Sequence, residues 1–224
     1  MKLCKMMFCF LIGASNFSLA QTTVEHEASL KETDQVQIWV SKGLTAHRKD
    51  DLMDAITWLS KAAKEGHAHA KAMLGYIYIR SGENELALPL LTAAADLNEG
   101  LAQYELATIY GQGTLVEKND GKAVELLEKS IAQDYFPAFV TLAKAHEEGS
   151  LGLKKNNAKA LEYYQQASDK GYSTATYRLI SAYKNGELGL AINQQKVKDL
   201  KAMLDKASKQ RKEDSVAKMN VDQY

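Results

Sequence analysis

The 224-residue sequence is poor in the residues that mark turns and build reactive sites. It has two prolines and 14 glycines, and so few chain-breaking residues argue against a turn-rich all-β fold. Neither sign of charge is in excess, because 28 Lys and Arg balance 28 Asp and Glu. Without a basic surplus to neutralise phosphates, we expect no nucleic-acid partner. The many Ala, Leu, Lys and Glu residues favour helices instead.

The first twenty residues have the layout of a secretory signal peptide. A short basic start at 1–5 precedes an apolar run at 6–14, and Ser18 and Ala20 are the small residues before a cut at Gln21. An apolar run of nine residues is shorter than the roughly 20 needed to cross a membrane, so we expect cleavage and no transmembrane segment in the mature chain. The sequence therefore predicts secretion across the inner membrane into the periplasm, with an extracellular location as the alternative.

Both cysteines lie within the predicted signal peptide. Cys4 and Cys9 are the two in the sequence, so cleavage leaves a mature chain without disulfides, thiol nucleophiles or cysteine metal ligands. The loss of Lys2 and Lys5 leaves 26 basic against 28 acidic residues. We expect residues 21–33 to form a flexible N-terminal segment and the mature protein to be a monomer.

A repeat with a period of 32 to 37 residues runs through the rest of the chain. Its anchors are Ile38, Ala70, Ala102, Ala138 and Ala175. From Ala70 onward each anchor is followed by an apolar residue four positions later and an aromatic residue or His eight positions later. This spacing places the anchors on one apolar face of a helix.

A second helix follows each of these helices and is marked by small and apolar residues at i, i+3 and i+7. The trios are Ala55, Trp58 and Ala62; Ala87, Leu90 and Ala94; Ala123, Leu126 and Ser130; Ala160, Tyr163 and Ala167; and, most weakly, Leu200, Met203 and Ala207. Five antiparallel helix pairs of this period predict an all-α, right-handed α-solenoid, in which the stacked pairs together make the core.

The repeat phase also predicts the domain limits. We expect a degenerate cap repeat at 34–65, repeats at 66–97, 98–133, 134–170 and 171–208, and a polar C-terminal tail at 209–224.

The repeats resemble the Sel1-like family, a tetratricopeptide-like family. The resemblance is carried by Trp58 to Ala70 with Leu74, Gly75 and Tyr78, and by Tyr110 to Val116 with Asp120, Lys122 and Ala123. Departures are a short loop at 81–85, and Asn98 and Asp134 where glycine is usual. The resemblance implies an interaction scaffold, and for an exported bacterial member a role in envelope assembly, signalling or host contact.

Residues suited to chemistry are sparse, and we expect no cofactor, no metal site and no catalytic residue. His67 and His69 are two residues apart, so on a helix they diverge by about 200° and cannot bind one ion together. The spacings Ser181 to Lys184 and Ser215 to Lys218 fit the Ser-x-x-Lys of penicillin-recognising enzymes. Since the resemblance also implies a link of some Sel1-like proteins to β-lactams, a β-lactam-interacting hydrolase of the cell envelope is the alternative function.

Binding is expected on the concave face, which the first helix of each pair lines in tetratricopeptide-like stacks. The main residues carried over by that analogy are His69, Tyr76, Arg80, Tyr104, Thr108, Lys144, Tyr177, Ser181 and Lys184. The same positions also include Ala72, Ile79, Leu101, Gln112, Val140, Glu147, Glu148, Thr174 and Asn185. Tyr and Arg are common at binding hot spots, and Lys adds charge that suits an extended, acidic peptide. We therefore predict an exported scaffold that binds a protein or peptide partner in this groove. Contact of the same tyrosines with peptidoglycan or another glycan is a further alternative.

Overall fold

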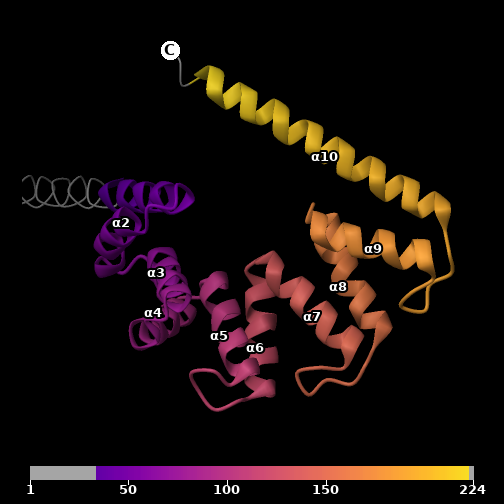
Figure 1. Cartoon of the computed structure of the whole chain (residues 1–224), viewed down its shortest axis with the longest axis horizontal. Coiled ribbons are helices and arrows are strands. Elements are labelled where there is room, and N and C mark those ends of the chain that lie inside the picture. Colours follow the sequence, from indigo (N-terminus) through magenta and orange to yellow (C-terminus); the bar gives the residue numbers. More distant parts are fainter. Residues whose placement is uncertain (1–33, 222–224) are drawn as a thin grey trace, which may run out of the picture.

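The chain folds as a series of helices, described in a computed structural model over residues 34–221 (Figure 1). Residues 34–48 form the first helix, and no strand occurs within the described range, so the predicted all-α class is confirmed. The following helices are α2 (Leu52–Lys64), α3 (Ala68–Ser81), α4 (Asn84–Asp96), α5 (Gly100–Gln112), α6 (Asp120–Ala132), α7 (Phe136–Glu148), α8 (Asn157–Asp169), α9 (Ser173–Asn185) and α10 (Gln194–Val221). The expected signal peptide at 1–20, with Cys4 and Cys9, and the segment 21–33 lie outside the described residues.

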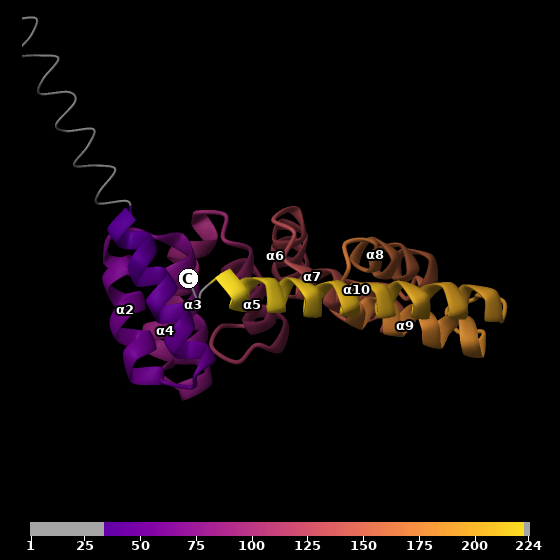
Figure 2. The same cartoon turned by 90° about the horizontal axis from the view of Figure 1, so that it is seen from above.

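The helices stack in chain order. Each helix from α2 onward packs against the next one, and α3 also contacts α5. From α2 to α9 they follow an arc, and α10 runs back from α9 across the open side of that arc (Figure 1). In the view from above, α10 projects over α9, α7 and α5 (Figure 2). This succession of helix pairs is the predicted solenoid.

Helix α10 is longer than its counterparts, with 28 residues where α9 has 13. Residues 209–221, expected in a polar tail, continue this helix. Val197 is buried against α9, whereas Met203, which we expected on the apolar face, is 37% exposed. Its neighbour Leu204 is the half-buried residue, because the stripe facing α9 runs through positions 197, 200 and 204. Among residues 34–221, no helix is long and apolar enough to span a membrane.

The turns between pairs share one backbone conformation. Gly66 and Gly171 have φ values of +87° and +85°, and Asn98 and Asp134 have +60° and +56° at the equivalent places. The departures from glycine therefore leave the loop shape intact, because Asn and Asp tolerate the left-handed region better than other residues with side chains.

The core consists of the anchors and their neighbours. Ala70, Ala102, Ala138 and Ala175 are fully buried, as the repeat predicted. Ile38 differs, with 46% of its surface exposed, because it belongs to the terminal repeat. In the second helices of the first four pairs the sequence pattern missed the most buried large side chains, which lie one position after the middle of each trio. They are Leu59, Leu91, Leu127 and Tyr164.

Small residues allow the two helices of a pair to approach closely. A Cβ atom added at Gly75 on α3 would lie 2.6 Å from the Cγ of Leu91 on α4 and 3.3 Å from a backbone oxygen. Gly43 in the first helix has the same relation to Leu59 on α2, again at 2.6 Å. Since real Cβ contacts are never this short, the helix spacing depends on these two glycines.

Replacing Gly75 by Ala should therefore destabilise the fold. Overpacking of a close helix contact costs about 1–3 kcal/mol, which corresponds to a fall in Tm of roughly 3–10 °C in a protein of this size. Thermal unfolding followed by circular dichroism would measure it. Gly121→Ala on α6 is the matched control, since its Cβ would meet only the Asn119 side chain at 3.6 Å. Equal Tm values for the two variants would contradict the packing argument.

Candidate functional site

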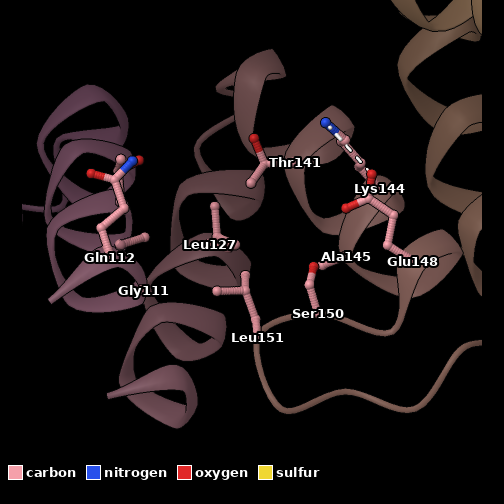
Figure 3. A pocket seen from close by; sticks show the side chains of 11 residues that line it. Gly111, Gln112, Leu127, Thr141, Lys144, Ala145, Glu148, Ser150 and Leu151 are labelled. Carbon is pink, nitrogen blue, oxygen red and sulfur yellow. Dashed lines mark ion pairs between the residues drawn. The ribbon is translucent and has the colours of Figure 1, made fainter. Parts of the chain in front are cut away.

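A cavity of about 230 Å³ lies between α5 and α7. Its apolar lining is Ala107, Gly111, Leu127, Ala145 and Leu151, and its polar lining is Thr108, Gln112, Thr141, Lys144, Glu148 and Ser150. Leu127 of α6 and Leu151 lie between Gln112 on one side and Glu148 on the other (Figure 3). The cavity is thus an apolar hollow with a polar rim.

The rim carries one ion pair. The Lys144 Nζ lies 3.6 Å from the Glu148 Oε1, one helical turn away on α7 (Figure 3). Thr108 and Lys144, both predicted groove residues, face this cavity together. The structure therefore brings this part of the predicted groove into one place.

A second hollow lies between the helix at residues 34–48 and α3. It measures about 480 Å³. Its lining residues are Gln37, Val40, Ser41, Leu44, His47, Arg48 and Met73. None of these was among the predicted groove residues. The analogy did not extend to the helix at 34–48 in the degenerate repeat, and Met73 on α3 lies three residues after the anchor Ala70, a position that it did not include.

Between the two hollows lies a cluster of aromatic and charged residues on α3 and α5. The Tyr76 ring meets His47 edge-on at 6.0 Å, and the Arg80 guanidinium lies 6.0 Å from the Tyr76 ring centre. Tyr104 packs against Tyr135, with 5.3 Å between ring centres. Three predicted residues, Tyr76, Arg80 and Tyr104, thus belong to one stretch of surface.

Glu105 is a member of this stretch that the sequence analysis missed. It is half-buried on α5, and no hydrogen bond or carboxylate–cation contact within 4.0 Å involves it among residues 34–213. Burial raises the pKa of its carboxyl above the usual 4.5, and the charge of Arg80 opposes that shift. The only signal in the sequence was its position three residues after the anchor Ala102, which the analogy did not include.

An aromatic row continues from Tyr104 towards α9. Tyr135 and Phe136 lie 6.4 Å apart, and Phe136 stacks on Tyr172 at 4.5 Å. Burial is the main cause that raises the pKa of the Tyr135 hydroxyl, so this group stays protonated. Tyr135 and Tyr172 precede α7 and α9, outside the helical positions that the analogy used, so it could not find them.

Other predicted groove residues have structural roles. His69 Nδ1 lies 2.9 Å from Glu99 Oε1, which ties α3 to the start of α5. Ala72 and Leu101 are buried in the core and cannot contact a partner. Among the described residues no group of three His, Cys, Asp or Glu side chains is arranged to hold a metal ion.

The residues on α9 form a separate polar network. Arg178 pairs with Glu147 of α7 and with Glu187, and the Tyr164 hydroxyl donates to the same Glu147 over 3.0 Å. The bonds from Arg178 lower the pKa of Glu147. The predicted Ser181 donates to Glu187 over 3.4 Å. This network joins three helices of neighbouring repeats.

Ser181 therefore lies beside a carboxylate and an amide. Its oxygen accepts a hydrogen bond from Asn185 over 3.3 Å, while Lys184 is exposed on the same helix. A Ser-x-x-Lys nucleophile needs the amine at its hydroxyl to take the proton, and no such bond to Ser181 occurs in the described part of the chain. Ser215 and Lys218 belong to α10, beyond the side chains that the structure describes.

Tyr177 is 62% exposed and lies apart from the other predicted tyrosines. It lines a hollow of about 440 Å³ between α9 and α10. The other lining residues are Ser173, Leu204, Asp205, Ser208, Arg211 and Lys212. The third tyrosine of the predicted groove thus faces the C-terminal helix.

Substitution of Glu105 should show the cost of its burial. Because desolvation raises the pKa of Glu105, ionisation of this carboxyl at neutral pH destabilises the folded chain relative to the unfolded one; well below pH 4.5 the carboxyl is protonated in both and this cost is absent. Glu105→Gln should therefore raise Tm at pH 7 by up to about 3 °C and change it little at acid pH. Calorimetry at both pH values measures the difference. The exposed Glu128→Gln is the control, and a lower Tm for Glu105→Gln at pH 7 would contradict the expectation.

The comparisons with known proteins agree with this architecture. The family model described as the Sel1 repeat matches residues 41–67, 100–135 and 142–172. No curated protein matches the chain in sequence.

Solved structures share the fold. A Sel1 repeat protein from Oxalobacter formigenes superposes with a TM-score of 0.69 at 25% identity, covering 78% of this chain and 72% of that one. A protective antigen present in uropathogenic Escherichia coli strains, which displays an SLR fold, superposes with a TM-score of 0.58 at 26% identity. This match covers 80% of this chain and 39% of the antigen. A Pseudomonas aeruginosa protein gives 0.52 at 21% identity, over 77% and 81% of the two chains, which shows the fold alone. The family match and these structures show that the chain contains Sel1 repeats and folds as Sel1 repeat proteins do.

Proposed function

We propose that this protein is an exported bacterial scaffold that binds an extended segment of a protein partner in a groove. The groove is the surface that the first helix of each pair forms between the α5–α7 cavity and the hollow beside α3. The α5–α7 cavity carries the proposal. It combines an apolar floor with a few polar rim groups, including Thr108 and Lys144, and this combination is typical of sites that take a side chain and orient it.

The surface beside the cavity supports the same function. Tyr76 and Tyr104 are half-buried, so their rings are held in place while one edge stays accessible. Arg80 is exposed next to Tyr76. Fixed aromatic and guanidinium groups are the types that contribute most to protein interfaces.

Export is the second half of the proposal. It rests on the basic, apolar and small-residue sections of residues 1–20. One structural relative is a protective antigen of Escherichia coli, and an antigen that protects is expected to reach the cell surface or beyond. This relative supports an extracytoplasmic setting for the chain.

The export proposal predicts a defined N-terminus. When the full chain is expressed in a Gram-negative host, we expect the periplasmic fraction to contain a form that begins at Gln21. Intact-mass measurement of the purified protein identifies the first residue. Replacing Ala20 by a bulky Arg should block cleavage and leave the longer form in the membrane fraction. A cytoplasmic chain that retains Met1 would overturn the export proposal.

The groove proposal predicts that its tyrosines are needed for partner capture. The double variant Tyr76→Ala and Tyr104→Ala should lose the envelope protein that the wild-type chain retains, because it removes the aromatic contact area of the groove. Affinity capture from envelope extract followed by mass spectrometry measures retention, and circular dichroism checks that the helices persist.

A variant with three exposed substitutions outside the groove controls for general surface effects. Thr92, Lys129 and Glu162 are exposed on α4, α6 and α8, and their replacement by Ala should leave capture unchanged. Retention of the partner by the tyrosine variant would remove the groove from consideration. If instead the tyrosine variant loses sedimentation with purified sacculi while protein capture persists, the glycan alternative replaces the peptide proposal.

A further inference from the structure

Two hollows of the groove are built from the same positions of different repeats. The corresponding residues are Leu44 and Thr108, His47 and Gly111, Arg48 and Gln112, and, on the next first helix, Met73 and Thr141. Repeats of a solenoid stack in one orientation, so equivalent positions face the same side. The hollow beside α3 and the α5–α7 cavity therefore open on one face, two repeats apart.

The repeat between them offers polar groups in place of a hollow. Tyr76 stands at the position of Leu44 and Thr108, and Glu105 stands at the position of Met73 and Thr141. The Glu105 carboxylate makes no hydrogen bond and no ion pair within 4.0 Å among the described side chains, and Arg80 acts on it only at longer range. It can therefore accept a hydrogen bond from a backbone N–H that passes over it. The middle of the groove thus suits a peptide backbone, and its two ends suit side chains.

The size of the hollows limits what they can take. A cavity of about 150 Å³ is enough to hold benzene in a protein interior, and the α5–α7 cavity has about 230 Å³. Val40, Leu44 and Met73 give the other hollow a comparable apolar lining. Each hollow can therefore take one apolar side chain of the size of Leu or Phe.

The repeat geometry sets the distance between the two side chains. Of the first helices, α3 and α5 are in direct contact, and the axes of packed helices lie about 8–10 Å apart. With this spacing taken for each repeat, two repeats span about 16–20 Å. Since an extended chain advances about 3.3 Å per residue, this span corresponds to five or six residues.

Charge distinguishes the two ends of the groove. Arg48 and Arg80 occupy the same position of consecutive first helices and are exposed. Among the described side chains neither has a carboxylate within 4.0 Å, and Arg48 donates to the Thr45 hydroxyl over 3.1 Å. Lys144 at the other end is already paired with Glu148. The end beside α3 therefore offers free positive charge to a partner.

We propose that the groove recognises an extended partner segment with two apolar anchor residues five or six positions apart and an acidic residue beside the anchor that enters the hollow at α3. This proposal deepens the scaffold function and rests on it. The two hollows provide affinity, the cluster of Tyr76 and Glu105 receives the backbone between the anchors, and Arg48 and Arg80 fix the direction of the segment.

Selection from a library tests the spacing directly. A phage library of random twelve-residue peptides is panned on the full chain, and the enriched sequences are aligned. We expect apolar pairs separated by five or six positions with Asp or Glu near one of them. Moving the two anchors two residues closer in a synthetic copy of an enriched peptide should weaken binding at least tenfold in a polarisation assay, since one buried apolar side chain contributes about 1.5 kcal/mol.

Variants that fill each hollow assign the anchors. Ser41→Phe should fill the hollow at α3, and Gln112→Trp should cover the α5–α7 cavity from its exposed rim; each should weaken the enriched peptide at least tenfold. Thr141→Phe is a second filler of the α5–α7 cavity in case one variant fails to fold. Thr92→Phe, exposed on α4, is the control and should bind as the wild-type chain does. Arg48→Ala combined with Arg80→Ala should remove the preference for an acidic residue.

The outcomes separate the two proposals. Enriched peptides without the spaced pair, no enrichment at all, or binding that survives both filled hollows would overturn the two-anchor proposal. If the tyrosine variant nevertheless loses an envelope partner, the scaffold function stands on its own. If the wild-type chain neither captures a partner nor selects peptides, both proposals fail.

Discussion

The close contact within each helix pair is the constraint on which the rest of the structure depends. Gly75 and Gly43 let a leucine of the second helix reach the backbone of the first, and the fully buried alanine anchors let neighbouring pairs stack closely. With the core built from small residues on one side of each first helix, the opposite side is free to carry Tyr, Arg, Lys and Glu. Because small residues suffice on the packing side of each first helix, the large polar residues can lie on the groove side.

The sequence predicted the helix pairs and their phase because a repeat pattern reports contacts that recur. It could not predict contacts that occur once. The charge of Arg80 in the preceding repeat acts on Glu105, and Phe136 stacks on Tyr172 of the following repeat. The repeat pattern contains neither interaction, because each joins residues of two different repeats. Met203 was misplaced because the stripe of α10 that faces α9 runs through positions 197, 200 and 204.

The two halves of the groove differ in how their charges are satisfied. Towards α9, Arg178 joins two glutamates, and a tyrosine hydroxyl completes the network, so these groups hold repeats together. Towards the first helix, Arg48 and Arg80 are exposed and Glu105 is half-buried. Buried charge without a partner is costly, and a fold that retains Glu105 keeps it at the expense of stability. Polar groups used for packing and polar groups available to a partner are thus separated along the stack.

The stack is held together by contacts between neighbours in chain order, with α3 and α5 as a direct contact between first helices. The curvature of such a stack is the sum of the small rotations between successive repeats, so a small change at each interface adds up along the chain. The distance between the hollow at α3 and the α5–α7 cavity must then change with curvature. A segment anchored in both would fix the curvature of the stack, and the number of residues between its anchors would determine that curvature.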